Sequence, residues 1–245
     1  MNRFILSFLF ILFAVPQLAL AQGQVASRLI RGSNFQIGVG YYYQRVDFQD
    51  LNDATQSAGY PELSENIHSV SFITQNISNH WVLTLRTSFS LNNEEQTANR
   101  EIEFNNQQYA LGLGHNMLRS ERARLIPGVM ATLSRNVLQF QDRNRSSANF
   151  QSLAQNPTGQ AQLSNYSYLA DAGLEFHYLF YRREKEGDVT RMSSWVPLTL
   201  KAGYQFQLNE SDFKFDGNTV AGAPNVSLGG FYASIHIGLG SRMLK

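Results

Sequence analysis

The chain has 245 residues, of which 43% are hydrophobic and only 16% charged, with a net charge of +1 and no cysteine. The charged share is well below the roughly 25% of an ordinary soluble protein. Past residue 21, no apolar run approaches the ~20 residues of a membrane-spanning helix. The composition therefore excludes a helical membrane protein, a disulfide scaffold, a cysteine-bound metal site and nucleic-acid binding driven by bulk charge.

The first 21 residues have the features of a secretory signal peptide. A short basic start precedes an apolar stretch from Phe4 to Val15, and Ala19-Leu20-Ala21 forms the small-x-small pattern of a cleavage site. The apolar stretch is shorter than the ~18 residues that a membrane anchor needs. We therefore expect an exported mature chain of 245 − 21 = 224 residues. The predicted organisation is a signal peptide at 1–21, a short polar lead-in at 22–33 and one folded domain at 34–245.

From residue 34 onward, hydrophobicity alternates with a period of two, which is the pattern of β-strands. Eight segments show it, in chain order 35–44, 69–75, 81–91, 108–114, 125–134, 166–178, 196–207 and 230–239. In each segment one face is apolar and the other is small or polar. A soluble β-sandwich and a membrane barrel both produce this alternation, so two further patterns are needed to separate them.

The first pattern is the position of the glycines, which lie almost entirely on the polar face. They are Gly38, Gly40, Gly112, Gly114, Gly128, Gly173, Gly203, Gly230, Gly238 and Gly240, with Gly229 alone on the apolar face. A sandwich gains nothing from glycine on its solvent face, because glycine weakens strands. A narrow closed barrel does gain, because its concave interior lacks room for large side chains.

The second pattern is the position of the aromatic residues, which gather at the segment ends on the apolar face. One level holds Phe35, Trp81 and Tyr178, and the other holds Tyr41, Tyr43, Phe89, Tyr166, Tyr168, Tyr204 and Phe231. Two aromatic girdles around an aliphatic band are typical of a barrel that crosses a bilayer. The sequence therefore predicts an all-β fold, an eight-stranded antiparallel up-and-down transmembrane β-barrel.

Connection lengths predict the orientation. If both termini face the periplasm, the outer connections are 47–65, 92–103, 138–162 and 209–226, and the inner ones are 76–80, 116–123 and 182–193. Long outer loops and short inner turns characterise barrels in the outer membrane of Gram-negative bacteria. The densest charge run, at 182–188, is interpreted as a solvated inner turn.

In architecture the chain resembles the small eight-stranded outer-membrane barrels, such as the OmpA barrel, OmpX and the PorT-like proteins of Bacteroidetes. The resemblance covers residues 34 to about 241 and rests on the segment pattern, not on a sharp motif. It implies the fold and the outer-membrane location, and says little about activity, because one barrel carries many functions. The chain ends in Ser-Arg-Met-Leu-Lys and not in the terminal aromatic residue of many such barrels, and we expect no peptidoglycan-binding domain.

Several ionisable residues lie on the predicted inward face, at about one level of the lumen. They are Arg86, Asp171, Glu175, His177, Lys201 and His236. We interpret them as an internal network in which opposite charges pair so that none is buried alone. The alternative is a hydrolase with Ser234 as the nucleophile and His236 or His177 as its base, but the sequence supplies no oxyanion donors beside them.

These features predict a non-enzymatic protein that acts through its extracellular loops and rim, with no cofactor, no metal ion and no catalytic residues. We expect it to be an accessory of an outer-membrane assembly or secretion complex, or a surface-binding protein. The expected partners are outer-membrane lipid and lipopolysaccharide and other envelope proteins, and not nucleic acid. The alternatives are a lipid-modifying enzyme, a narrow channel, or a barrel that binds a small ligand at its mouth near Tyr42, Gln44 and Gln205.

Overall fold

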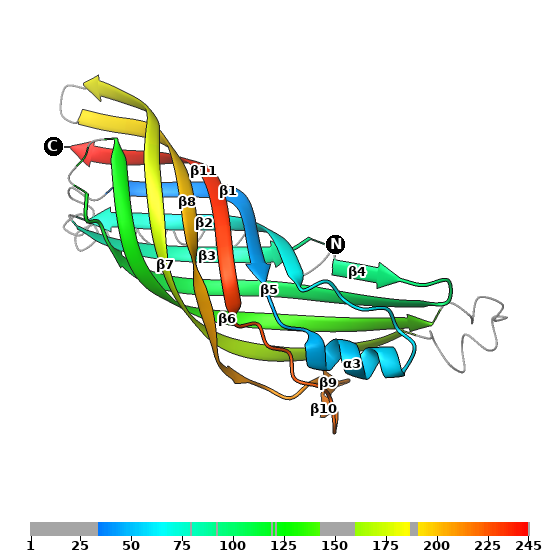
Figure 1. The fold of residues 1–245 in the computed structure, drawn as a ribbon. Helices are drawn as coiled ribbons and strands as arrows, with labels where there is room; N and C mark the ends of the chain where they lie inside the picture. The colour runs from blue at the N-terminus through cyan, green and yellow to red at the C-terminus, as the bar shows by residue number, and fades with distance from the viewer. Residues whose placement is uncertain are drawn as a thin grey trace.

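The computed structural model describes residues 34–78, 80–91, 93–118, 120, 122–142, 160–186 and 191–244. The predicted signal peptide and lead-in lie outside these residues. Within them, eight long antiparallel strands form a barrel (Figure 1). They are β1 (Asn34–Arg45), β2 (Asn66–Ser78), β3 (Trp81–Ser90), β5 (Arg100–His115), β6 (Ala123–Asp142), β7 (Gln160–Glu186), β8 (Arg191–Glu210) and β11 (Gly230–Leu244).

The barrel is closed because each of these strands pairs with two neighbours. Along the chain the order is β1, β2, β3, β5, β6, β7, β8, and β11 then closes the ring by pairing with both β8 and β1. Closure leaves no free sheet edge across the barrel wall. The predicted eight-stranded antiparallel up-and-down barrel is confirmed. No helix in the described ranges is long and apolar enough to cross a membrane.

The two faces of the wall differ as the alternation predicts. In β1, Phe35, Ile37 and Val39 point outward and are 44–47% exposed, whereas Gln36 and Gln44 point inward and are fully buried. The other strands repeat this arrangement, with leucine, valine, isoleucine and phenylalanine outside. An apolar exterior around a closed, internally hydrogen-bonded barrel is the arrangement that a lipid bilayer requires.

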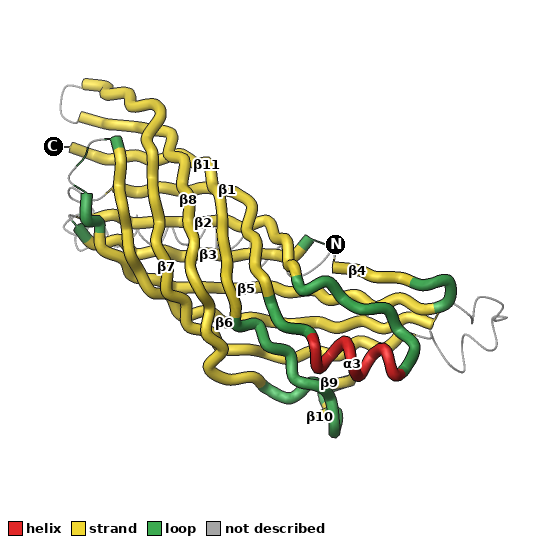
Figure 2. The backbone as a smooth tube through the Cα atoms, viewed as in Figure 1, coloured by secondary structure: helices red, strands yellow, loops and turns green. Residues whose placement is uncertain are grey.

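Short elements gather at one end of the barrel, which by the long-loop rule is the outer end. They are α3 (Gln49–Ser57), β4 (Asn93–Gln96), β9 (Lys214–Phe215) and β10 (Asn218–Thr219) (Figures 1 and 2). The first predicted outer connection therefore contains a helix, and the second is largely a β4–β5 hairpin. Strands β6 and β7 also remain paired beyond the predicted strand ends, because backbone pairing does not stop at the membrane surface.

At the inner end, the interpretation of the charge run as a turn is wrong for most of its length. Residues 182–186 continue β7 and pair with β8, from Arg182 opposite Trp195 to Glu186 opposite Arg191. Strand pairing therefore extends further toward the inner end than the sequence predicts. A charged sequence is compatible with this pairing because, past the lipid, a strand is stabilised by backbone hydrogen bonds and does not need an apolar face.

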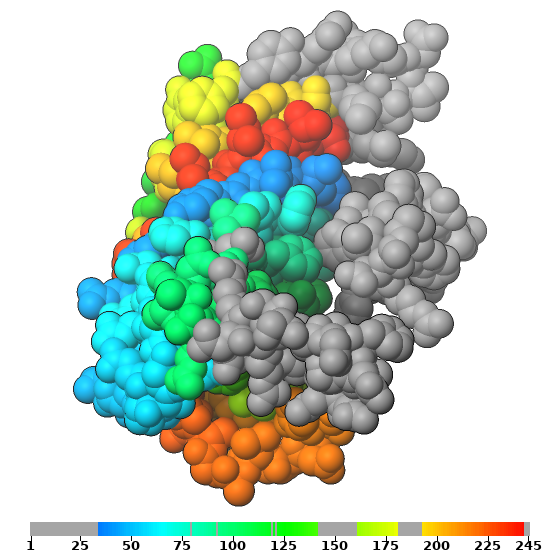
Figure 3. All heavy atoms as spheres, turned by 90° about the vertical axis from the view of Figure 1, so that its right-hand side faces the viewer, coloured from blue at the N-terminus to red at the C-terminus, as the bar shows by residue number. Residues whose placement is uncertain are grey.

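A hydrophobic cluster at the outer end, here named the outer cap, lies at the mouth of the barrel. Its buried members are Val46, Phe48, Leu51, Leu63, Ile67, Ile102, Phe104, Leu138, Leu169, Phe213, Val226 and Leu228. They come from the first and fourth outer connections and from the extended parts of the strands. Figure 3 views this end and shows the α3 region, in blue to cyan, beside the orange residues of the fourth connection. A backbone bridge from Asp47 to Ser227 ties the two connections together.

The local sequence explains why α3 forms there. The Asp47 side chain accepts a hydrogen bond from the Gln49 backbone N–H at 2.9 Å, which satisfies one of the free donors at the start of the helix. Leu51 and Thr55, four residues apart, form its buried face. The chain leaves the helix through Gly59, whose φ of +80° favours glycine. Phe48, just before the helix, packs edge-on against Phe104 of β5 at 4.8 Å between ring centroids.

The inward glycines make room for large side chains from other strands. Gly114, Gly128, Gly173 and Gly203 lie in direct register across four neighbouring strands. A Cβ atom added at Gly173 or Gly203 would collide with the hydroxyl of Tyr232, which reaches across the lumen from β11. The glycine face predicted from the sequence is therefore the surface against which an inward aromatic side chain packs.

Replacing Gly173 by valine is expected to destabilise the barrel, because the new side chain would collide with Tyr232 and with the Ala202 carbonyl oxygen, 2.8 Å from the added Cβ. Overpacking of this kind costs about 1–3 kcal/mol. The free energy of unfolding in detergent, from urea titration, measures the effect. The matched control is Ala172→Val on the neighbouring lipid-facing position, which should unfold like the unaltered protein; equal losses in both variants would contradict the packing argument.

Candidate functional site: the lumen and the outer cap

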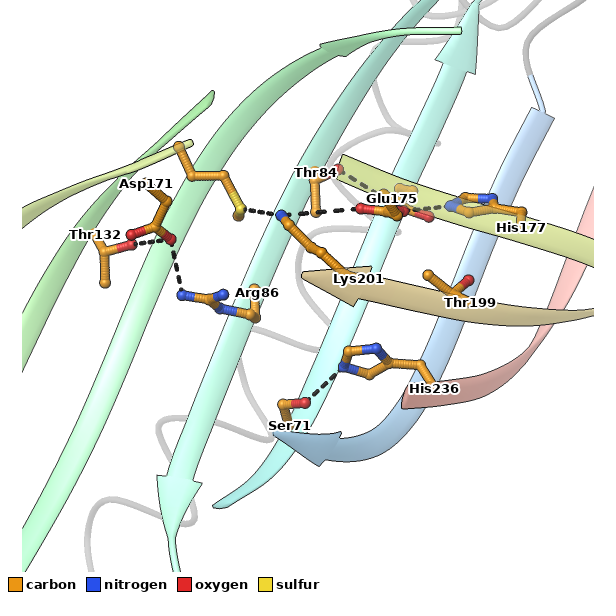
Figure 4. Close-up of polar contacts among 12 residues, drawn as sticks. Ser71, Thr84, Arg86, Thr132, Asp171, Glu175, His177, Thr199, Lys201 and His236 are labelled. Carbon is orange, nitrogen blue, oxygen red and sulfur yellow. Dashed lines mark hydrogen bonds and ion pairs between the residues drawn. The ribbon is translucent and has the colours of Figure 1, made fainter. Parts of the chain in front are cut away.

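The best-defined charged contact in the lumen joins Arg86 of β3 to Asp171 of β7. Arg86 Nη2 lies 3.1 Å from Asp171 Oδ2, and both side chains are at most 2% exposed. The same carboxylate oxygen accepts a hydrogen bond from the Thr132 hydroxyl at 3.1 Å (Figure 4). The guanidinium group also lies 4.6 Å from the ring centroid of Tyr42 and 5.7 Å from that of Tyr232. The buried cation is thus stabilised by one carboxylate and two aromatic faces.

A second cluster surrounds Glu175 of β7. Its carboxylate contacts the ring of His177 and accepts a hydrogen bond from the Gln75 amide. The ammonium group of Lys201 lies 3.9 Å from the other carboxylate oxygen and 2.8 Å from the sulfur of Met130. Lys201 is directly opposite Glu175 in the β7–β8 register. The carboxylate therefore has a cation, an imidazole and an amide around it.

The six predicted ionisable residues thus fall into three separate sets of contacts. Arg86 pairs with Asp171 and not with the Glu175 group, so removal of Glu175 would leave Arg86 with its partner. His236 forms a third contact, at 2.6 Å between its Nε2 and the hydroxyl of Ser71. The six residues are all placed inside the lumen, and their role as a stabilising network stays a prediction.

Ser71 is the residue that reasoning from the sequence did not connect to this set. It lies on β2 and His236 on β11, and both are register partners of Gly40 on the strand between them. Because Gly40 has no side chain, the serine hydroxyl and the imidazole meet above it. The glycine in the middle strand was the sequence signal for this contact. It could be interpreted only once the strand register was known.

The lumen does not assemble the alternative hydrolase site among the described residues. Ser234 and His236 are buried, and His236 bonds to Ser71 while the Ser234 hydroxyl has no hydrogen-bond partner. In the same residues, no group of three or more histidine, aspartate or glutamate side chains could hold a metal ion.

Apolar side chains bound the polar lumen at its inner end. Ile77, Val82 and Ile126, at the inner ends of β2, β3 and β6, form a buried cluster. Trp195 of β8 is 4% exposed, and its ring occupies the space that a side chain at Gly240 would need. Together these four residues are here named the inner plug. This end also holds a buried cation, because the guanidinium carbon of Arg124 lies 5.6 Å from the centroid of the Trp195 ring.

The mouth residues proposed for ligand binding are covered by the outer cap. Tyr42, Gln44 and Gln205 are at most 1% exposed. The Gln44 amide donates to the Leu228 carbonyl at 2.6 Å, and its own oxygen accepts from Gln108 at 2.8 Å. These side chains are engaged with the protein itself and offer no open ligand pocket.

The aromatic residues expected in the girdles lie on the outer surface. Exposed members are Tyr41, Trp81, Tyr166, Tyr168, Tyr178 and Tyr204, while Tyr43 is half-buried. Between them, the outward side chains are aliphatic or phenylalanine over most of the wall. Soluble proteins rarely expose so large an apolar surface to water. The chain is an eight-stranded β-barrel whose apolar, aromatic-flanked exterior suits a membrane.

Comparison with known proteins finds only distant similarity of fold. No protein-family model matches the chain, and no curated protein matches it. Ail, the attachment invasion locus protein of Yersinia pestis, is 14% identical, with 86% of this chain and 99% of that one covered and a TM-score of 0.44. A major outer membrane protein from Thermus thermophilus is 7% identical, with 87% of this chain and 100% of that one covered and a TM-score of 0.40. Neisserial surface protein A is 8% identical, with 86% of this chain and 97% of that one covered and a TM-score of 0.36. These values describe similarity of fold only.

Replacing Asp171 by leucine is expected to lower the free energy of unfolding by about 3–5 kcal/mol, because it leaves the buried Arg86 cation without its carboxylate. The double variant Arg86→Leu/Asp171→Leu should recover much of that loss, since neither charge then remains buried. Urea titration in detergent of the two single variants and the double variant gives the coupling energy. Additive losses would mean that the two side chains do not stabilise each other.

Proposed function

We propose that this protein is a non-enzymatic outer-membrane component that works through its extracellular surface, as a surface-binding protein or an accessory of an envelope complex. The observation that carries the proposal is that buried apolar side chains gather at both ends of the lumen, in the outer cap and in the inner plug. A barrel of eight strands has an interior just wide enough for side chains. A filled interior of this width favours a role at the cap and the rim over passage of solutes.

The outer end also supplies a rigid surface for recognition. The exposed face of α3 is polar, with Asp53 and Gln56 in solvent above the buried Leu51. The strands β5 and β6 extend beyond the membrane as a paired sheet, from Arg100 opposite Asp142 downward. Binding residues held on secondary structure that packs on its own hydrophobic core are better ordered than residues on free loops. Outer-membrane lipid, lipopolysaccharide and envelope proteins are the partners we propose for this surface.

The two alternatives receive less support. A narrow channel needs a continuous polar path, whereas the lumen ends in Trp195 on one side and in Phe48 and Leu51 on the other. A lipid-modifying enzyme needs an accessible nucleophile with its base, whereas Ser71 and His236 are buried inside the wall.

In planar bilayers the protein is expected to show no steady conductance. The cap variant Phe48→Ala/Leu51→Ala should also stay closed, because the inner plug still blocks the lumen. Adding Trp195→Ala to it should still give no steady current, because the buried side chains between the two ends fill the lumen. Steady current through the unaltered protein would overturn the proposal in favour of a channel.

A photo-crosslinking amino acid at Gln56, on the exposed face of α3, is expected to capture a partner of defined mass in intact cells. The matched control carries the same probe at Met117, which is 63% exposed at the opposite end of the barrel. Products at Met117 alone would place the working surface in the periplasm and contradict the proposal. Native mass spectrometry of the complex in mild detergent then gives the stoichiometry.

A further inference from the structure

An unusual set of polar side chains lies on the lipid-facing side of the wall, at the outer ends of β1 and β2. Outward positions of β1 carry Tyr41, Tyr43 and Arg45, and those of β2 carry Asn66 and His68. In the strand register, Tyr43 is opposite His68 and Arg45 is opposite Asn66. Side chains in such pairs are close neighbours on one face. The five residues therefore form one continuous patch at the level of the outer aromatic residues.

Within this patch, each tyrosine hydroxyl bonds to a polar atom of its neighbour. The Tyr41 hydroxyl bonds to Nδ1 of His68, and the two rings stack with centroids 5.8 Å apart. The Tyr43 hydroxyl donates to Oδ1 of Asn66 at 2.7 Å. When Nδ1 accepts from Tyr41, a neutral imidazole carries its proton on Nε2. The groups of His68 and Asn66 that can then bind a ligand are N–H donors: Nε2–H of the histidine and the two N–H groups of the amide.

Arg45 adds a cation to these donors. Its side chain is 68% exposed and lies 3.4 Å from Glu65, whose side chain is 41% exposed. An ion pair this exposed contributes little free energy, so Glu65 competes only weakly with another anion for the guanidinium group. Guanidinium, imidazole and amide N–H groups on one patch are a set of donors suited to the oxygens of a phosphate.

The surroundings of the patch indicate that this phosphate belongs to a lipid. Directly below it on the same outward face, Val39 of β1 and Phe72 of β2 are more than 40% exposed toward the membrane. A ligand that binds the patch therefore also lies along an apolar wall, as the acyl chains of a membrane lipid do. In a Gram-negative outer membrane, the phosphorylated lipid of the outer leaflet is a glycolipid.

We propose that Arg45, Asn66 and His68, here named the outer-rim donor cluster, bind a phosphate group of an outer-leaflet glycolipid of the lipid A type, and that Tyr41 and Tyr43 are positioning residues that aim the donors of His68 and Asn66. This proposal rests on the proposed function, which already names lipopolysaccharide among the partners, but it needs no protein partner, so loss of lipid A binding and absence of a crosslinked protein at Gln56 are separate results.

The test uses the full protein in a phosphate-free maltoside detergent, with lipid A as the probe and native mass spectrometry as the readout of bound lipid. Arg45→Gln and His68→Phe should each weaken lipid A binding by about tenfold, which corresponds to ~1.4 kcal/mol. Glu65→Gln should strengthen it, because the competing carboxylate is removed. The matched control is His115→Phe, which replaces an exposed histidine beside Trp81 at the opposite membrane interface and should leave binding unchanged.

Two further probes identify the chemistry. The affinity of the unaltered protein for enzymatically dephosphorylated lipid A should be low. It should not exceed the affinity of the His68→Phe variant for phosphorylated lipid A. Tyr41→Phe should shift the ¹⁵N resonances of the His68 ring away from the Nε2–H tautomer and weaken binding, while leaving the thermal unfolding temperature near that of the unaltered protein.

Three results would overturn the proposal. Equal binding of phosphorylated and dephosphorylated lipid A would mean that the acyl chains alone are recognised. An equal loss in the His68→Phe and His115→Phe variants would mean that any interfacial histidine has the same effect. If inorganic phosphate alone moves the His68 resonances as strongly as lipid A does, the patch binds free phosphate and not a lipid.

Discussion

The carboxylates that point into this barrel have their cationic partners inside the barrel, because the other side of the wall is lipid. The Arg86–Asp171 pair shows how strict this condition is: both side chains are almost completely buried, and aromatic rings and a threonine hydroxyl complete their surroundings. The lumen is too narrow to hold much water. Pairing across strands therefore ties β3 to β7 and β7 to β8, in addition to the backbone hydrogen bonds of the wall.

The same narrow space explains the positions of the inward glycines. Tyr232, Trp195 and the His236–Ser71 contact each lie where a glycine on the facing or intervening strand leaves room. Around the lumen, large side chains thus lie beside glycines, and the large side chains fill the space without collisions. A filled lumen supports the barrel from inside, and it is the reason why the proposed functional surfaces lie at the ends of the barrel and on its lipid-facing rim.

The outer cap and the outer-rim donor cluster divide that surface by environment. The cap has its own hydrophobic core and presents polar residues to the extracellular solvent, which suits contact with soluble or surface partners. The donor cluster lies below it at the level of the lipid headgroups, where tyrosine hydroxyls can orient polar groups beside an apolar wall. The two surfaces adjoin along the chain, since β1 leads from Arg45 directly into Val46 and Phe48 of the cap.

The sequence alone determined the features that depend on alternation. Because side chains in a strand point to opposite faces in turn, the period of two separated lipid-facing residues from lumen residues, and with the glycine and aromatic positions it predicted the closed eight-stranded barrel. The tertiary structure alone decided which residues meet. The Ser71–His236 contact depends on the register of three strands, and the assignment of Arg86 to Asp171 depends on how far each side chain reaches across the lumen. The cap was also invisible in the sequence, because Phe48 and Leu51 are isolated apolar residues in a polar connection, and they form a core only when the ends of distant strands bring Phe104, Leu169 and Val226 against them.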